Sequence, residues 1–170
     1  QILLNNLLYD MSEVGIPFDS VDPQEITTPQ AWNIAGILRF TLIMGALSSA
    51  FDIATFLVLI KLFHAAPDEF RTAWFVESMA TQILVIFFIR TSGRFYASTA
   101  SRMLIVTSFG ALVLAMAIAL APLGAFFGFV GLPLALIAVV VFITAAYLLA
   151  AEMTKNVAAR FARSVPARIR

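Results

Sequence analysis

MLIVTSFGALVLAMAIALAPL, residues 103–123, contains no charged side chain. At about 1.5 Å per residue, a helix of this length reaches across the roughly 30 Å hydrocarbon core of a bilayer. A helix on the surface of a soluble protein would instead carry polar and charged residues on its outer face. The stretch therefore predicts a helix that crosses a membrane.

The whole chain has the same character. Its 170 residues are 61% hydrophobic and 12% charged, with a mean hydropathy of +0.95, whereas soluble domains average about 45–50% apolar and about 25% charged residues. The net charge of +1 gives no signal for nucleic acid, so we expect lipid as a partner and no nucleic acid. The chain has no cysteine and one histidine, His64, so oxygen atoms must hold any bound metal.

Further stretches of about 20 predominantly apolar residues predict more membrane helices. The first of them starts abruptly at Gln1, without a charged flank, and we expect the chain to be a piece of a longer protein. The predicted fold class is all-α: one polytopic membrane helix bundle over residues 1–170, with five transmembrane helices. Their expected spans are 1–18, 37–60, 72–89, 103–123 and 130–151.

Basic residues predict how the bundle is oriented. Most of the Lys and Arg residues lie in segment 90–102 and in the tail from residue 152, and two spans separate these segments. They therefore lie on the same side, which the positive-inside rule makes cytoplasmic. We expect an integral membrane protein with a cytoplasmic C-terminus, and loops 61–71 and 122–133 on the opposite side.

The first span carries polar side chains at helical spacing. With about 100° of rotation per residue, Asn6, Asp10, Glu13 and Pro17 share one narrow stripe of a helix. Polar groups inside a span default to functional hypotheses, and these oxygens suit a hard cation. Pro17 frees a backbone carbonyl near residue 13, and Gly15 adds flexibility. Two alternatives stay open: Asp10 bonds a neighbouring helix, and Glu13 marks the exit of the helix into headgroups.

Two later spans carry one acid each. Asp52 lies about 13 Å in from Lys61, and Glu77 lies about 9 Å in from Arg71, at about 1.5 Å per residue. The two carboxyl groups could therefore share a level of the membrane and join the stripe as cation ligands. For Asp52 a structural hydrogen bond is the alternative. For Glu77 a proton carrier and a structural group remain open.

The sequence carries no catalytic motif. It has no Gly-rich phosphate loop, no nucleophile elbow, no metalloprotease helix and no Asp-Lys-Thr-Gly phosphorylation motif. We therefore expect no catalytic residue and no bound cofactor in this chain.

Several strings, however, resemble one family. LLNNLLYD followed by IPFDSVD, then PQAWNIAGILRF, FDIATF, WFVES and ATQILVIFFIRT are similar to the C-terminal membrane region of magnesium-transporting P-type ATPases. The resemblance implies transmembrane helices six to ten of a ten-helix pump, with the first helix partly unwound. NLLYD resembles the NLVTD of calcium pumps, which implies that Asn6 and Asp10 are ion ligands. Tyr9 replaces a threonine there, and Glu77 falls where calcium pumps use a glutamate.

The resemblance also implies the activity. The parent would be an ATP-driven translocase of a bacterial plasma membrane that transports Mg²⁺ and passes through an aspartyl-phosphate. ATP would bind cytoplasmic domains that this chain lacks, so the chain alone should be inactive. Its partner would be the missing N-terminal part of the same pump, with helices one to five. The alternatives are a calcium or other divalent-cation pump, a passive ion carrier, and an accessory membrane subunit.

Overall fold

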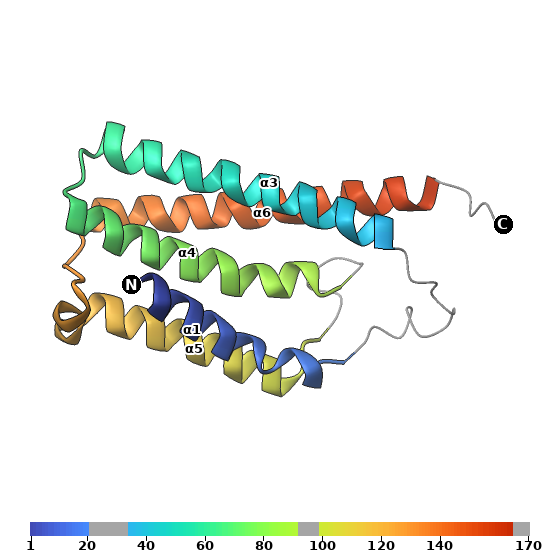
Figure 1. The fold of residues 1–170 in the computed structure, drawn as a ribbon, viewed down its shortest axis with the longest axis horizontal. Coiled ribbons are helices and arrows are strands. Elements are labelled where there is room, and N and C mark those ends of the chain that lie inside the picture. The colour runs from blue at the N-terminus through green and yellow to red at the C-terminus, as the bar shows by residue number, and fades with distance from the viewer. Residues whose placement is uncertain (21–33, 92–98, 165–170) are drawn as a thin grey trace.

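The computed structural model describes residues 1–20, 34–91 and 99–164 (Figure 1). Within these ranges the chain is entirely helical and has no strand, which confirms the all-α fold class. The α-helices are α1 (Ile2–Glu13), α3 (Ile34–Leu57), α4 (Pro67–Ile89), α5 (Arg102–Leu120) and α6 (Leu134–Ser164), joined by a π-helical turn η2 (Val58–Leu62) and by 3-10 helices η1 (Ile16–Phe18) and η3 (Pro122–Phe127).

Four helices are long and apolar enough to cross a membrane, and they match the predicted spans after the first. They cover Ile34–Leu62, Pro67–Ile89, Arg102–Leu120 and Leu134–Asn156. The apolar windows of α3, α5 and α6 are mostly exposed, whereas more than half of the α4 window is buried. Helix α3 in particular exposes Ile37, Leu38, Leu42 and Ile53. Such an apolar exterior is what a helix bundle presents to lipid.

The first predicted span, residues 1–18, differs from the others. Its α-helix has 12 residues, about 18 Å at 1.5 Å per residue, and continues past Glu13 as the short helix η1. The helix is regular through Asn6 and Asp10, so the expected unwinding begins only after Glu13. Pro17 in η1 cannot donate a backbone hydrogen bond, which is consistent with the end of α-helical geometry before it.

The helices run along a common axis, and their ends fall into two groups (Figure 1). One end, here called the hairpin end, holds the α3–α4 turn and the α5–α6 connection. The other, here called the tail end, holds the last turns of α1, α4 and α6 and the first turns of α3 and α5. Arg90, Arg102 and the start of the basic tail therefore lie at one end of the bundle, as predicted, and that this end is cytoplasmic stays a prediction.

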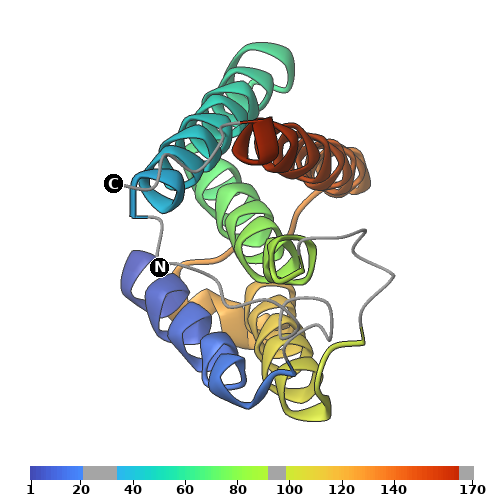
Figure 2. The ribbon, with the colours of Figure 1, turned by 90° about the vertical axis from the view of Figure 1, so that its right-hand side faces the viewer.

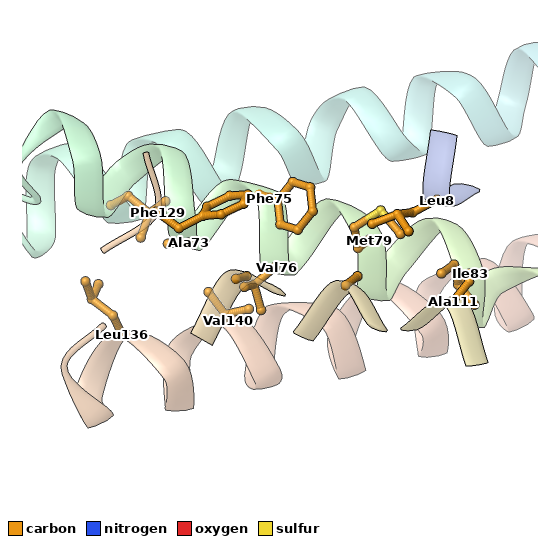
Figure 3. Close-up of a cluster of buried hydrophobic side chains, with 13 residues drawn as sticks. Leu8, Ala73, Phe75, Val76, Met79, Ile83, Ala111, Phe129, Leu136 and Val140 are labelled. Carbon is orange, nitrogen blue, oxygen red and sulfur yellow. The ribbon is translucent and has the colours of Figure 1, made fainter. Parts of the chain in front are cut away.

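Helix α4 is the centre of the bundle. It lies between the pair α1 and α5 and the pair α3 and α6 (Figure 2). Its side chains supply much of the core, and residues of α1, η2, α5 and α6 complete it together with Phe129, which follows η3 (Figure 3). Phe75 packs on Phe129 with ring centroids 4.6 Å apart. Because α4 is buried among the other helices, its polar side chains, Glu77 above all, are enclosed by the bundle.

Candidate cation-binding site

The predicted stripe lies on the face of α1 that no described helix covers. Asn6, Asp10 and Pro17 are exposed, and Glu13 is half-buried. The opposite face of α1 packs against α4 and α5. The structure thus brings Asn6 and Asp10 to one side of a regular helix, about one turn apart by their spacing of four residues.

Asn5 faces the other way and was missed by the sequence reasoning. Its Nδ2 donates to Gln82 Oε1 at 3.3 Å, and Gln82 Nε2 donates to Ser78 Oγ at 2.8 Å. Asn5 is 5% exposed, so it holds α1 on α4. The signal was available, because Asn5, Leu8 and Ser12 follow the spacing of three and four residues that marks a buried helix face.

The end of α1 is fastened to α5. The carbonyl of Ser12 accepts hydrogen bonds from Thr107 Oγ1 (3.2 Å) and Ser108 Oγ (3.4 Å). The sequence predicted a free backbone carbonyl near residue 13 as a possible cation ligand. In the structure the carbonyl of Ser12, one residue earlier, already accepts hydrogen bonds from two hydroxyl groups. Hydroxyl donors at a helix end satisfy carbonyls that lack an intrahelical partner.

Gly15 acts through its size. A Cβ atom there would lie 2.3 Å from Thr107 Oγ1 and 2.6 Å from the Cα of Leu104. Its φ of −76° is one that any residue adopts. Gly15 thus allows close contact between the end of α1 and the first turn of α5, and its expected role in flexibility stays a prediction.

Asp52 and Glu77 form a second group of acids. Glu77 is 1% exposed, and its Oε2 has no hydrogen-bond partner; Asp52 is half-buried on α3. The two residues lie on the neighbouring helices α3 and α4, and their shared level stays a prediction. The nearby hydroxyls do not bond these carboxylates: Thr81 donates to the Glu77 carbonyl (3.0 Å), and Ser48 bonds Tyr147 (2.8 Å).

The five candidate ligands do not gather in one cluster. No group of three or more Asp, Glu or His side chains capable of holding a metal occurs in the part of the chain that the structure describes. The candidates form two sets instead. One is the stripe on α1, with Asn6, Asp10 and Glu13, and the other is the pair Asp52 and Glu77.

The tail end holds an ion pair that the sequence did not predict. Arg90 Nε lies 2.7 Å from Asp19 Oδ2, with side chains 8% and 15% exposed. The backbone N–H of Ser101 donates to Asp19 Oδ1 at 2.8 Å. Partial burial raises the pKa of Asp19, but these hydrogen bonds and the Arg90 charge outweigh it, so this pKa lies below its ordinary value of 3.8.

Lys155 also departs from the sequence interpretation, which placed it in a basic tail. It is 4% exposed. Its Nζ donates to the carbonyl of Phe88 at 2.7 Å and lies 2.7 Å from Glu152 Oε2. A cation at the last carbonyls of a helix interacts favourably with the helix dipole, so Lys155 of α6 fixes the end of α4.

Comparison with known proteins agrees with this architecture. The family model described as "Cation transporting ATPase, C-terminus" matches residues 1–157. The "Magnesium-transporting ATPase, P-type 1" of Escherichia coli K12 is 37% identical over 160 residues, which is 91% of this chain and 18% of that protein. The protein of the same name from Salmonella typhimurium 14028s is 35% identical over the same shares. The chain thus spans less than a fifth of the length of these relatives, and it belongs to the family of cation-transporting ATPase C-terminal regions.

Proposed function

We propose that this chain is the membrane part of an ATP-driven magnesium transporter and supplies ligands for Mg²⁺ within the membrane. The family match and the names of the relatives support a cation pump and point to this ion. Hydrolysis of ATP belongs to parts of the protein outside this chain, so residues 1–170 alone have no ATPase activity.

The observation that carries the proposal is the polar stripe on α1. Its carboxylate and amide oxygens face away from α4 and α5, although most of the other residues of α1 are apolar. Ionisable groups in membrane helices face protein or a water-filled cavity, because exposure to lipid is costly. Asn6 and Asp10 therefore face an ion pathway that other segments of the pump complete.

The ligand chemistry fits magnesium. Mg²⁺ binds through one or two carboxylates and keeps several of its waters. Asp10 supplies a carboxylate and Asn6 an amide oxygen, with Glu13 about one turn further along the same face. These three residues are the proposed ligands of the transported ion from α1.

The proposed setting is a bacterial plasma membrane, with the tail end in the cytoplasm. The excess of Lys and Arg near that end supports this orientation by the positive-inside rule. The exposed apolar side chains of α3 and α5 would then contact lipid, and the partner of the α1 stripe would be the remainder of the same pump.

The test is Asp10→Asn in the full-length protein, reconstituted in vesicles. We expect ATP-driven Mg²⁺ uptake to be lost, because the substitution removes the ligand charge and keeps the shape. Thermal stability should not change, since Asp10 is exposed. Asp68→Asn, an exposed acid at the hairpin end, is the matched control and should transport normally.

Uptake by Asp10→Asn with the wild-type dependence on Mg²⁺ would contradict the ligand assignment. Uptake of Ca²⁺ in preference to Mg²⁺ would identify a different divalent-cation pump. Uptake that persists without ATP would identify a passive carrier.

A further inference from the structure

The connection between α5 and α6 is entirely apolar. Residues 121–133, APLGAFFGFVGLP, include no charged side chain and no side chain that forms hydrogen bonds. The α3–α4 turn at the same hairpin end is different, because Lys61, His64 and Asp68 lie in it or beside it (Figure 1). One end of the bundle thus has a charged connection and an uncharged one, and the two suit different surroundings.

Two phenylalanines of this apolar connection point out of the bundle. Phe126 is 89% exposed and Phe127 is 50% exposed, and both belong to η3. Phe129, two residues later, is buried and packs on Phe75 of α4. The inner side of the connection is therefore part of the core, while its outer side displays two aromatic rings.

The backbone of the connection is folded on itself. The N–H group of Gly124 donates to the Ala121 carbonyl at 2.9 Å, that of Gly128 to the Ala125 carbonyl at 3.1 Å, and that of Phe129 to the Gly124 carbonyl at 3.0 Å. A backbone in hydrocarbon must find its hydrogen-bond partners within the protein, because lipid tails supply none. These bonds meet that requirement, which a connection in water does not face.

Hydrogen bonds from other helices complete the arrangement. Gln1 Nε2, at the start of α1, donates to the carbonyls of Phe127 (3.2 Å) and Gly128 (2.9 Å). Thr72 Oγ1 of α4 accepts from the N–H group of Val130 at 3.1 Å. Since Thr72 directly follows Arg71, Val130 lies level with the charged end of α4 and not beyond it.

The lengths of the flanking helices place η3 at the edge of the hydrocarbon. In α5, Leu120 lies 18 residues after Arg102, and in α6, Glu152 lies 18 residues after Leu134. At 1.5 Å per residue both distances are about 27 Å, slightly less than the roughly 30 Å hydrocarbon core. With Arg102 and Glu152 at the tail-end boundary, both helices reach only as far as the opposite boundary, where η3 joins them.

We propose that η3 is a lipid anchor: Phe126 and Phe127 insert among the acyl chains, just below the headgroups of the leaflet at the hairpin end. Transfer of phenylalanine into a membrane is favourable, and no charge of the connection opposes it. Through Gln1 the anchor fixes the depth at which α1 begins, five residues before Asn6. The inference goes beyond the proposed function, because it concerns neither the ion nor its ligands.

The experiment measures where the rings lie in the full-length protein, reconstituted in phosphatidylcholine vesicles. A nitroxide label is attached at Phe126→Cys, made the single cysteine of the protein. Electron paramagnetic resonance then compares its collisions with O₂, which concentrates in hydrocarbon, and with a water-soluble nickel chelate. We expect frequent collisions with O₂ and a loss of those with the chelate. His64→Cys, at the charged turn of the same end, is the matched control and should show the opposite preference.

Frequent collisions of the Phe126 label with the chelate would place η3 in water and overturn the anchor. Exclusion of both reagents would mean that protein covers the rings, and would overturn it as well. Phe127→Cys should show the same preference for O₂, and it decides the question if Phe126→Cys does not fold. None of these outcomes depends on Mg²⁺ uptake, so transport by Asp10→Asn would refute the ion ligands and leave the anchor standing.

Discussion

Asp19 and Arg90, 71 residues apart in the sequence, form a two-point ion pair at the tail end. Arg90 Nε donates to Oδ2 at 2.7 Å and Nη2 to Oδ1 at 3.3 Å. Because Ser101 also donates its backbone N–H to the same carboxylate, one side chain joins the segment after α1 to the end of α4 and the start of α5. The pair therefore sets the spacing of three helices.

Asp19→Asn should destabilise the bundle by roughly 3 kcal/mol, since it removes the carboxylate charge that lies 2.7 Å from the buried Arg90 side chain. The measurement is unfolding of the protein in detergent, followed by circular dichroism. Asp68→Asn is the control: its pair with Arg71 is exposed, and exposed pairs contribute about 0–1 kcal/mol. Equal losses in the two variants would contradict the structural role of Asp19.

The same pair predicts a pH dependence. Because the folded pKa of Asp19 lies below the ordinary value of 3.8, its contribution to stability is complete above that value. It is lost as the pH falls through the lower folded pKa. The difference in stability between wild type and Asp19→Asn should thus be constant from about pH 5 to about pH 7 and should shrink below about pH 4. A difference that shrinks already near neutrality would contradict the assignment.

Gly15→Ala should cost about 1–3 kcal/mol, because the new methyl group would overlap α5 backbone atoms at Leu104. Gly110→Ala is the matched control on α5, where an added Cβ meets nothing within 4 Å. That variant should gain about 0.5–1 kcal/mol from lower backbone entropy of the unfolded chain. Thermal melts of both variants measure the contrast, and a neutral Gly15→Ala would show that α1 does not rest on α5.

Substitutions of the neighbouring residues Asn5 and Asn6 should have opposite effects on stability and transport. Asn5→Ala should lower the stability by about 1–3 kcal/mol, because it leaves Gln82 Oε1 without its donor. Asn6→Ala should leave stability unchanged and raise the Mg²⁺ concentration for half-maximal transport at least about tenfold, since it removes one proposed ligand. Melting curves and uptake assays on both variants are the measurements. A stable Asn5→Ala with impaired transport, or an unstable Asn6→Ala with normal transport, would contradict the roles given to these two residues.

Lys155→Met should destabilise the tail end by roughly 3 kcal/mol, because Glu152 then keeps a buried, unpaired charge. Adding Glu152→Gln should recover much of the loss, since the remaining charge is removed. A double variant as unstable as Lys155→Met would mean that the contact of Lys155 with the Phe88 carbonyl, and not the ion pair, carries the effect.

Hydropathy predicted the later spans because their signal is local. A run of apolar residues such as 103–123 is long enough to cross a bilayer whatever surrounds it, and the described helix Arg102–Leu120 follows it closely. The grouping of basic segments predicted which helix ends lie together. Residues 21–33, which include the acids Asp22 and Glu25, lie outside the described residues.

Pairings between distant segments could not be predicted. Nothing local distinguishes Asp19, which meets Arg90, from other acids near a span, and Lys155 reads as one more basic residue of a tail. The candidate ligands show the same limit. Helical spacing placed Asn6 and Asp10 on one face, but the burial of Glu77 depends on how the other helices pack around α4.

The contact at Gly15 has a mechanical consequence for the proposed ion ligands. The end of α1 rests on α5 backbone and is tied there through the Ser12 carbonyl, whereas Asp10 and Asn6 lie progressively further along a helix with one uncovered side. A tilt of α1 about residues 12–15 would displace Asn6 more than Asp10, and it would break the hydrogen bond between Asn5 and Gln82 that holds α1 on α4. The proposed ligands can therefore move relative to α4 only when that contact is released.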